Sequence, residues 1–258
     1  MQIHPTAIVD PGAELAEDVK IGPYVIINKD VSIGAGTEIM AHAHIDSYTK
    51  IGRGCTVYPS ASLGTAPQDV TYAGENTELI IGHNVTIREF VTVNRGTLKG
   101  GGVTRVGDGC YLMTYAHVGH DCQIGRNVTL VNNLAMAGHV IVEDEAILSG
   151  LVAVHQHVRI GTHAYIGGVS RVTKDVPPYM LGQGVTDFKL YGPNTIGLKR
   201  KGFPRETIAA LRGAFHLVFR TNRLLAETLE DALIKFPDVP EVKNMVEFIK
   251  SSKRGVTR

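Results

Sequence analysis

The sequence predicts a mainly β protein, a parallel β-solenoid followed by a small α-helical domain. Two observations carry this prediction: a six-residue repeat of aliphatic side chains from Ile3 to Val172, and a change to helical spacing after Pro204. We expect the solenoid at residues 1–189 and the helical domain at 190–258. The chain has 258 residues, 43% of them hydrophobic and 20% charged, which is the composition of an ordinary globular protein.

The repeat holds 26 apolar positions spaced six residues apart in blocks. A period of six is neither helical nor a simple alternation, and it fits a short strand plus a tight turn, with the aliphatic side chain pointing inward. Three units make a triangular coil of 18 residues, and stacked coils, about 4.8 Å apart, bury the aliphatic columns. The positions are Ile3, Val9, Leu15, Ile21, Ile27, Ile33, Ile39, Ile45, Ile51, Val57, Leu63, Ile81, Ile87, Val93, Val106, Leu112, Val118, Ile124, Leu130, Met136, Val142, Leu148, Val154, Ile160, Ile166 and Val172. They predict about nine coils.

Two insertions interrupt the repeat, at about 64–80 and 95–105. Long loops at the corners of a solenoid leave the stacking intact, and loops often carry binding residues. The second insertion contains three consecutive glycines, Gly100–Gly102, which indicate a flexible or tightly turning backbone.

The C-terminal region changes character. After Val176 the repeat stops, and Pro177, Pro178 and the segment from Gly184 to Gly197 are expected to be irregular chain. Helical spacing then predicts three helices, one that begins at Pro204, one at Leu224–Phe236 and one at Val242–Ile249.

Cysteine and charge content indicate the compartment and the partner. Cys55, Cys110 and Cys122 all fall at small inward positions of the repeat, so we expect buried free thiols in a reducing compartment. There is no signal-peptide pattern and no apolar run of 18 residues, so we expect a cytoplasmic protein without a transmembrane segment. Residues 196–258 hold 13 Lys and Arg against 7 Asp and Glu. This excess favours an acidic protein partner, and we expect no nucleic acid.

The stretch His117–His139 concentrates the chemistry. Six of the eleven histidines lie between 117 and 163, and none occupies an inward aliphatic position. In a coil of 18 residues, Gly138 lies one coil after His120, and His139 lies one coil after Asp121. A carboxylate beside an imidazole fixes its tautomer and raises its basicity. His120 can then take a proton from an attacking hydroxyl while a backbone N–H near Gly138 stabilises the oxyanion, without a serine or cysteine nucleophile.

Several motifs resemble one enzyme family. They are AHVGHDC at 116–122, LAMAGHV at 134–140, AVHQ at 153–156, KDVPPY at 174–179 and GLKRKGFPRE at 197–206, with PQD in the first insertion and RGTLKGGG in the second. On these motifs the chain resembles, over essentially its whole length, the UDP-N-acetylglucosamine 3-O-acyltransferases. These are hexapeptide-repeat transferases that catalyse the first step of lipid A synthesis. The resemblance implies a left-handed parallel β-helix, because the period alone does not set the hand.

The family resemblance also implies an activity. An (R)-3-hydroxyacyl chain would pass from acyl carrier protein to the 3-position of UDP-N-acetylglucosamine, in a homotrimer with active sites between subunits. No cofactor and no metal are implied, because the acyl donor is carried on the phosphopantetheine of the carrier protein. By resemblance, His120 is the general base, Asp121 orients it, and the Gly138 amide is the oxyanion donor. The basic helical domain would receive the acidic carrier protein.

The resemblance assigns further roles. Substrate-binding residues would be His117, His139, His155, Gln156, Gln68, Asp69, Asn194, Arg200 and Lys201. Among these, Asn194, Arg200 and Lys201 would hold the nucleotide diphosphate. Gly168 would leave room for the acyl tail and Tyr165 would shorten that room, so both bear on chain length.

Three positions depart from the family pattern. Thr71 stands where lysine is usual, Asn94 where histidine is frequent, and Lys201 where a second arginine is usual. The first two changes remove a cation and a titratable ring from the sugar pocket. We therefore expect altered acceptor selectivity, with a 3-amino sugar nucleotide as the alternative acceptor.

Three other functions compete with this one. A zinc enzyme of the γ-carbonic anhydrase type would use the histidine cluster as ligands, but the long helical tail does not suit it. The N-acyltransferase that acts later in the same pathway carries an additional N-terminal domain, for which a repeat that begins at Ile3 leaves no room. A non-catalytic solenoid would not require the pairing of His120 with Gly138.

Overall fold

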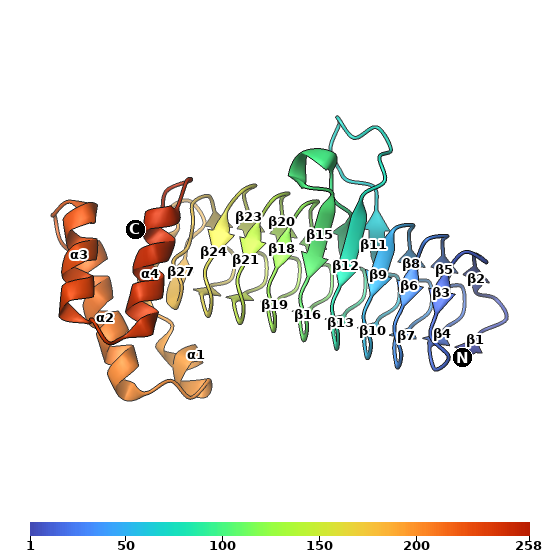
Figure 1. The fold of residues 1–258 in the computed structure, drawn as a ribbon, viewed down its shortest axis with the longest axis horizontal. Helices are drawn as coiled ribbons and strands as arrows, with labels where there is room; N and C mark the ends of the chain where they lie inside the picture. The colour runs from blue at the N-terminus through green and yellow to red at the C-terminus, as the bar shows by residue number, and fades with distance from the viewer.

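The computed structural model describes residues 1–258 and consists of a long parallel β-helix with a group of helices at its C-terminal end (Figure 1). Its 28 strands form three sheets that run along the length of the β-helix. Most strands have only two residues, because each six-residue unit contributes one short strand and one turn. The predicted β-solenoid is therefore confirmed.

Each regular coil gives one strand to each sheet, and the sheets, which we name A, B and C, have 11, 9 and 8 strands. Sheet A contains β1 (Gln2–Ile3), β4 (Lys20–Ile21), β7 (Glu38–Ile39), β10 (Thr56–Val57), β13 (Thr86–Ile87), β16 (Tyr111–Leu112), β19 (Thr129–Leu130), β22 (Ile147–Leu148), β25 (Tyr165–Ile166), β27 (Met180–Gln183) and β28 (Lys189–Pro193). Sheet B contains β2 (Ile8–Val9), β5 (Ile26–Ile27), β8 (His44–Ile45), β11 (Ser62–Thr65), β14 (Thr92–Asn94), β17 (His117–Val118), β20 (Ala135–Met136), β23 (Ala153–Val154) and β26 (Arg171–Val172). Sheet C contains β3 (Glu14–Leu15), β6 (Ser32–Ile33), β9 (Thr49–Ile51), β12 (Glu78–Ile81), β15 (Val103–Val106), β18 (Gln123–Ile124), β21 (Ile141–Val142) and β24 (Arg159–Ile160).

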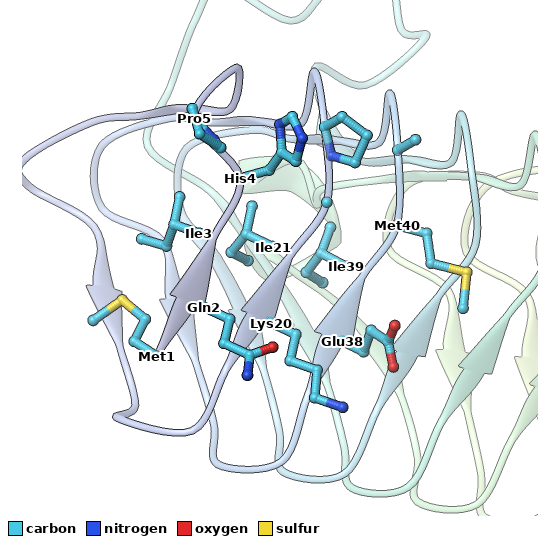
Figure 2. A pocket seen from close by; sticks show the side chains of 13 residues that line it. Met1, Gln2, Ile3, His4, Pro5, Lys20, Ile21, Glu38, Ile39 and Met40 are labelled. Atoms are coloured by element: carbon cyan, nitrogen blue, oxygen red, sulfur yellow. The ribbon is translucent and has the colours of Figure 1, made fainter.

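The register places equivalent residues of successive coils side by side. In the uninterrupted coils the pairing residues lie 18 positions apart, as in Ile3 with Ile21 and Ile21 with Ile39. Figure 2 shows this arrangement beside a groove at the N-terminal end, where Ile3, Ile21 and Ile39 form one row. The exposed fraction falls from 43% at Ile3 to 4% at Ile21 and 0% at Ile39, because each aliphatic side chain is covered by the coils on both sides.

Each coil turns at three corners, many of which hold a non-glycine residue in the left-handed region. The corner between sheets A and B does so in eight coils, and we call these residues the A–B corner column. They are Tyr24, His42, Ser60, Phe90, Tyr115, Asn133, Leu151 and Val169. Five of them are large apolar or aromatic residues that are more than 45% exposed, namely Tyr24, Phe90, Tyr115, Leu151 and Val169. A left-handed conformation is unfavourable for such side chains, so the column combines backbone strain with exposed apolar surface.

Both insertions leave the solenoid at the corner between sheets B and C. The first lies between β11 and β12, and the second lies between β14 and β15. The second contains a short 3-10 helix, η1 (Leu98–Gly100). Figure 1 shows the two insertions projecting together from one side of the β-helix. They lie at the same corner as Asp121, His139 and His157, which have left-handed backbones there.

The C-terminal helices are α1 (Thr195–Arg200), α2 (Arg205–Phe219), α3 (Leu225–Lys235) and α4 (Pro240–Ser251). The expected helix start at Pro204 is wrong by one residue, because Pro204 is the N-cap of α2. The expectation of irregular chain up to Gly197 is also wrong. Strand β28 pairs antiparallel with β27, and α1 follows it. Neither element repeats the six-residue pattern, so the period could not reveal them.

One hydrophobic core runs through both parts of the molecule. Its 60 buried residues extend from Val19 in the solenoid to Ile249 in α4 without a break. The three cysteines lie in this core with free thiols, as expected from their inward positions. No helix is long and apolar enough to cross a membrane.

Candidate active site

A pocket opens where sheet B meets the corner that carries the insertions. Strands β17, β20 and β23 supply its floor, and the first insertion reaches over it with Gln68. Its lining consists of Gln68, Asn94, His117, Gly119, His120, Ala135, Met136, Ala137, Gly138, Val154 and Gln156. The 18-residue register thus brings together His120, Gly138 and Gln156, which the sequence places in one column.

His120 and Asp121 form the central pair of this pocket. The Nδ1 atom of His120 lies 2.7 Å from Oδ2 of Asp121. The Asp121 side chain is 1% exposed and that of His120 is 14% exposed. When Nδ1 donates to the carboxylate, the neutral ring presents an unprotonated Nε2, which is the atom that can accept a proton.

Three contacts from the second insertion and its following strand fix Asp121. The backbone N–H of Thr97 donates to Oδ1 and the Thr97 hydroxyl donates to Oδ2, both at 2.7 Å. The Asp121 backbone N–H donates to the hydroxyl of Thr104 at 2.7 Å. A side chain at Gly100 would have to occupy the carboxylate position, since its Cβ would lie 2.0 Å from Cγ of Asp121. The glycine therefore allows η1 to approach the buried carboxylate.

Gly138 lies directly against the His120 ring. A Cβ added at Gly138 would lie 2.6 Å from Cε1 of His120, so any larger residue would displace the ring. The backbone N–H of Gly138 donates to no acceptor within the protein. An unpaired N–H beside a general base is the arrangement that stabilises the oxyanion of an acyl-transfer intermediate.

Two further histidines surround His120. His117 hydrogen bonds through Nδ1 to the Thr92 hydroxyl at 2.7 Å, and burial, together with the nearby His120, lowers the pKa of His117 below its usual value of 6.5. The His139 ring stands edge-on to His120, with centroids 5.0 Å apart. Burial lowers the pKa of His139 as well, against the opposing effect of Asp121. Both rings are therefore neutral at pH 7.

The first insertion brings a second carboxylate to this region. The backbone N–H and then the hydroxyl of Thr71 donate to Asp69, both at 2.8 Å, and lower the pKa of Asp69. The charges of Lys99 and His120 lower it further. Asp69 is therefore ionised at neutral pH.

The remaining sequence-predicted residues do not join this pocket within one chain. His155 is exposed, and its Nδ1 accepts from Arg254 at 2.9 Å. A second pocket on sheet A and α1 is lined by Glu145, Ile147, His163, Tyr165, Leu181, Asn194, Thr195, Ile196, Gly197, Arg200 and Lys201. Single-chain geometry thus divides the predicted site between sheets A and B.

In the sheet A pocket, several side chains already have partners. The Asn194 side chain accepts from the Gly197 N–H at 3.1 Å and so caps α1. Lys201 forms an ion pair with Glu145 at 2.6 Å. The Tyr165 hydroxyl accepts from Ser149 at 2.9 Å. Gly168 lies in the turn between β25 and β26, where an added Cβ would be 3.3 Å from the Gly150 carbonyl oxygen.

Comparisons with known proteins identify the family of this chain. Residues 104–134 match the family described as bacterial transferase hexapeptide (six repeats), and residues 175–257 match domain 2 of UDP-N-acetylglucosamine O-acyltransferase. The chain is 46% identical over 257 residues to the acyl-[acyl-carrier-protein]–UDP-N-acetylglucosamine O-acyltransferase of Thermodesulfovibrio yellowstonii, covering 100% of this chain and 99% of that protein. The chain belongs to the UDP-N-acetylglucosamine O-acyltransferase family.

Solved structures of family members have the same fold. The UDP-N-acetylglucosamine acyltransferase of Francisella novicida is 39% identical, with a TM-score of 0.96 over 100% of this chain and 94% of that chain. The enzyme of Bacteroides fragilis is 38% identical, with a TM-score of 0.96 over the full length of both chains. The protein is accordingly an acyltransferase with a left-handed parallel β-helix, as the motifs predicted. This membership separates it from zinc enzymes of the γ-carbonic anhydrase type and from non-catalytic solenoids.

The acyltransferase pocket contains one group of side chains that resembles a metal site. Ligand atoms of His120, Asp121 and His139 lie within 4.8 Å of one another. However, both carboxylate oxygens of Asp121 already accept hydrogen bonds from Thr97, and Oδ2 is also paired with Nδ1 of His120. A metal ion would have to displace these charge-assisted bonds, so the geometry favours a hydrogen-bonded pair.

Thr97 is a functional candidate that the sequence did not reveal. It lies within the RGT motif of the second insertion, but its distance of 24 residues from Asp121 gave no sign of contact. The structure shows that it holds the carboxylate that orients His120.

We therefore expect Thr97→Val to lower kcat for acyl transfer about tenfold, because a hydrogen bond to a charged group contributes about 1.5 kcal/mol or more. KM should change little, since Thr97 does not line the pocket. Thr97→Ser keeps the hydroxyl and should restore most of the rate. Steady-state kinetics of both variants, with thermal unfolding as a control for folding, test this role. Wild-type kcat in Thr97→Val would rule it out.

Proposed function

We propose that this acyltransferase transfers an (R)-3-hydroxyacyl chain from acyl carrier protein to the 3-position of UDP-N-acetylglucosamine, the first step of lipid A synthesis, in the cytoplasm. The observation that carries the proposal is the His120–Asp121 pair set against Gly138, whose N–H has no partner. The substrate names of the relative from Thermodesulfovibrio yellowstonii support the choice of donor and acceptor. The free buried thiols agree with a reducing compartment.

The proposed reaction is a direct attack on the thioester. Nε2 of His120 takes the proton of the sugar hydroxyl as the oxygen bonds to the carbonyl carbon. The Gly138 N–H donates to the resulting oxyanion, and Asp121 stabilises the imidazolium without taking its proton. Collapse of the intermediate breaks the C–S bond, and His120 returns the proton to the departing thiolate. All steps use protein groups and the two substrates, so we propose no cofactor and no metal.

The neighbouring side chains supply the contacts that orient the sugar. Gln68 and Gln156 line the same pocket as His120, and Asp69, which follows Gln68, adds a carboxylate for sugar hydroxyls. His117 and His139 bind as neutral rings, since the pKa of each is lowered by burial. A neutral imidazole both donates and accepts, which suits the hydroxyl and acetamido groups of a sugar.

We further propose a homotrimer whose subunits meet along the A–B corner column. This column carries exposed aromatic and aliphatic side chains in strained left-handed turns, which calls for a covering partner. Threefold packing around one corner sets sheet A of each subunit against sheet B of the next. The His120 pocket would then face the neighbour's Asn194, Arg200 and Lys201, which would hold the diphosphate. His155, which is exposed at the end of β23 in sheet B, would be available to bind substrate.

The acyl donor is proposed to enter along the same interface. Lys199, Arg200, Lys201 and Arg205 are exposed cations on α1 and the start of α2, and they suit an acidic carrier protein. Gly168 lies at the A–B corner and Tyr165 lies in β25 of sheet A, both in the last coils before these helices. They are proposed to limit the length of the acyl chain.

The activity itself is tested with purified protein, UDP-N-acetylglucosamine and a series of (R)-3-hydroxyacyl carrier proteins. We expect one acylated sugar nucleotide, identified by mass, and a kcat at least about 1,000-fold lower in His120→Ala, because general base and oriented attack are both lost. Exposed His4 is a matched control, and His4→Ala should keep the wild-type rate. Undiminished transfer by His120→Ala would refute the mechanism.

Asn94 favours a second acceptor, the 3-amino analogue. This residue is 2% exposed, and its Nδ2 donates to the Thr65 hydroxyl and to Ala66 O at 3.0 and 3.1 Å. Its Oδ1 is buried without any donor. A 3-hydroxyl has one proton, which goes to His120. A 3-amino group has a second N–H, which can satisfy Oδ1 of Asn94 and remove the penalty of an unpaired buried acceptor.

We therefore expect a higher kcat/KM for the 3-amino sugar nucleotide than for UDP-N-acetylglucosamine. A difference of roughly tenfold corresponds to one recovered hydrogen bond. Competition between equimolar acceptors, with products weighed by mass spectrometry, gives the ratio directly. Asn94→Leu has no acceptor oxygen and should bring the ratio toward one. An equal or higher kcat/KM for the hydroxy sugar in the wild-type enzyme would contradict the proposal.

The divided site predicts complementation between two inactive variants. His120→Ala and Arg200→Ala damage different faces, so co-assembled trimers contain some sites with neither change. Random mixing leaves about one quarter of the sites intact. We expect co-expressed, differently tagged variants to recover about that fraction of wild-type activity at low UDP-N-acetylglucosamine. Separately purified variants serve as the control, and activity no greater than theirs would exclude shared sites.

A further inference from the structure

Lys99 lies on η1 and connects the two insertions. Its Nζ donates to the Thr71 hydroxyl at 2.8 Å, and that hydroxyl donates to the Asp69 carboxylate at 2.8 Å. A chain of ammonium, hydroxyl and carboxylate therefore crosses from the second insertion to the first. It begins two residues after Thr97, which holds Asp121, and ends next to Gln68, which lines the His120 pocket.

The ammonium of Lys99 remains available to a ligand. Lys99 is exposed and takes part in no ion pair, and the Thr71 hydroxyl uses only one of its three N–H donors. Its charge lowers the pKa of Asp69, which directly follows Gln68 in the first insertion. Lys99 therefore brings an ammonium group with N–H donors to spare to the insertions, beside Thr71, where the family usually has a lysine.

We propose that Lys99 is an acceptor-binding residue that contacts the diphosphate of the sugar nucleotide from the insertion side of the pocket. This rests on the proposed function, which supplies a sugar nucleotide as acceptor. Thr71 positions the ammonium and Asp69 takes sugar hydroxyls, so the two insertions bind different parts of one ligand. The diphosphate is common to the 3-hydroxy and 3-amino acceptors, so the role of Lys99 does not depend on which is preferred.

The alternative is that Lys99 only ties the insertions together. If Lys99 were only a tether, Lys99→Met would remove the tether and Lys99→Arg would remove it as well, because its geometry would change. Neither variant would then weaken acceptor binding selectively. A phosphate-binding cation can instead be moved. In the double variant Thr71→Lys with Lys99→Met, the ammonium comes from the other end of the same hydrogen bond.

The test measures acceptor binding by calorimetry and steady-state kinetics separately. We expect Lys99→Met to weaken binding of UDP-N-acetylglucosamine about 5- to 20-fold and to raise its KM by a similar factor, with kcat and the KM for acyl carrier protein nearly unchanged. The double variant should recover most of the affinity. Lys29 is exposed in the N-terminal coils, and Lys29→Met should bind like wild type.

Each outcome separates the two proposals. Wild-type affinity in Lys99→Met, a change confined to the KM for the carrier protein, or failure of the double variant to recover would overturn the role of Lys99 alone. If the wild-type protein binds the sugar nucleotide but transfers no acyl group, the proposed reaction fails, while the affinities still decide the role of Lys99. No binding of the sugar nucleotide by wild type would overturn both.

Discussion

The parallel register of 18 residues per coil is the constraint on which the site depends. Each strand of the β-helix pairs with the strands of the coils before and after it, so residues 18 apart become neighbours without any flexible connection. His120 meets Gly138, and Asp121 approaches His139, because the backbone hydrogen bonds leave them no other position. His120, Asp121 and Gly138 then lie at fixed positions in the turns that follow β17 and β20. The proposed base, its orienting acid and the proposed oxyanion donor thus have the rigid placement that acyl transfer requires.

The insertions add what a regular coil cannot provide. A corner of the solenoid is exposed, and a carboxylate there would be solvated and weakly oriented. The second insertion folds back over Asp121 and gives it an N–H and a hydroxyl from Thr97, in place of water. Gly100 makes this approach sterically feasible, because its missing side chain leaves space for the carboxylate. The cost of burying the Asp121 charge is offset by three charge-assisted hydrogen bonds, two from Thr97 and one from His120. The His120–Asp121 pair is therefore fixed before substrate arrives.

The period predicted those parts of the structure that repeat and missed those that do not. It gave the β-helix, the inward cysteines and the neighbours of His120, because each follows from spacing alone. It could not give the contacts of Thr97, Asn94 or Lys99, since loops between coils follow local hydrogen bonding and glycine sterics. Asn194 illustrates the same limit. The family resemblance assigned it to the diphosphate, and the structure adds that its side-chain oxygen caps α1, a contact that the spacing of the repeat could not predict.

Division of the site between sheets A and B follows from the shape of the solenoid. A triangular prism has flat faces, and a single flat face cannot enclose a sugar nucleotide and an acyl chain. Enclosure needs a second face, and the nearest source is another copy of the same chain. The A–B corner column lies between the two half-sites and is the only corner at which aromatic and aliphatic side chains recur along the whole length. Burial of apolar surface along that column would offset the strain of its left-handed turns. The same contact would bring the half-site on sheet A of one subunit to the half-site on sheet B of the next. On this reasoning, the proposed assembly of the subunits and the formation of the active site are one event.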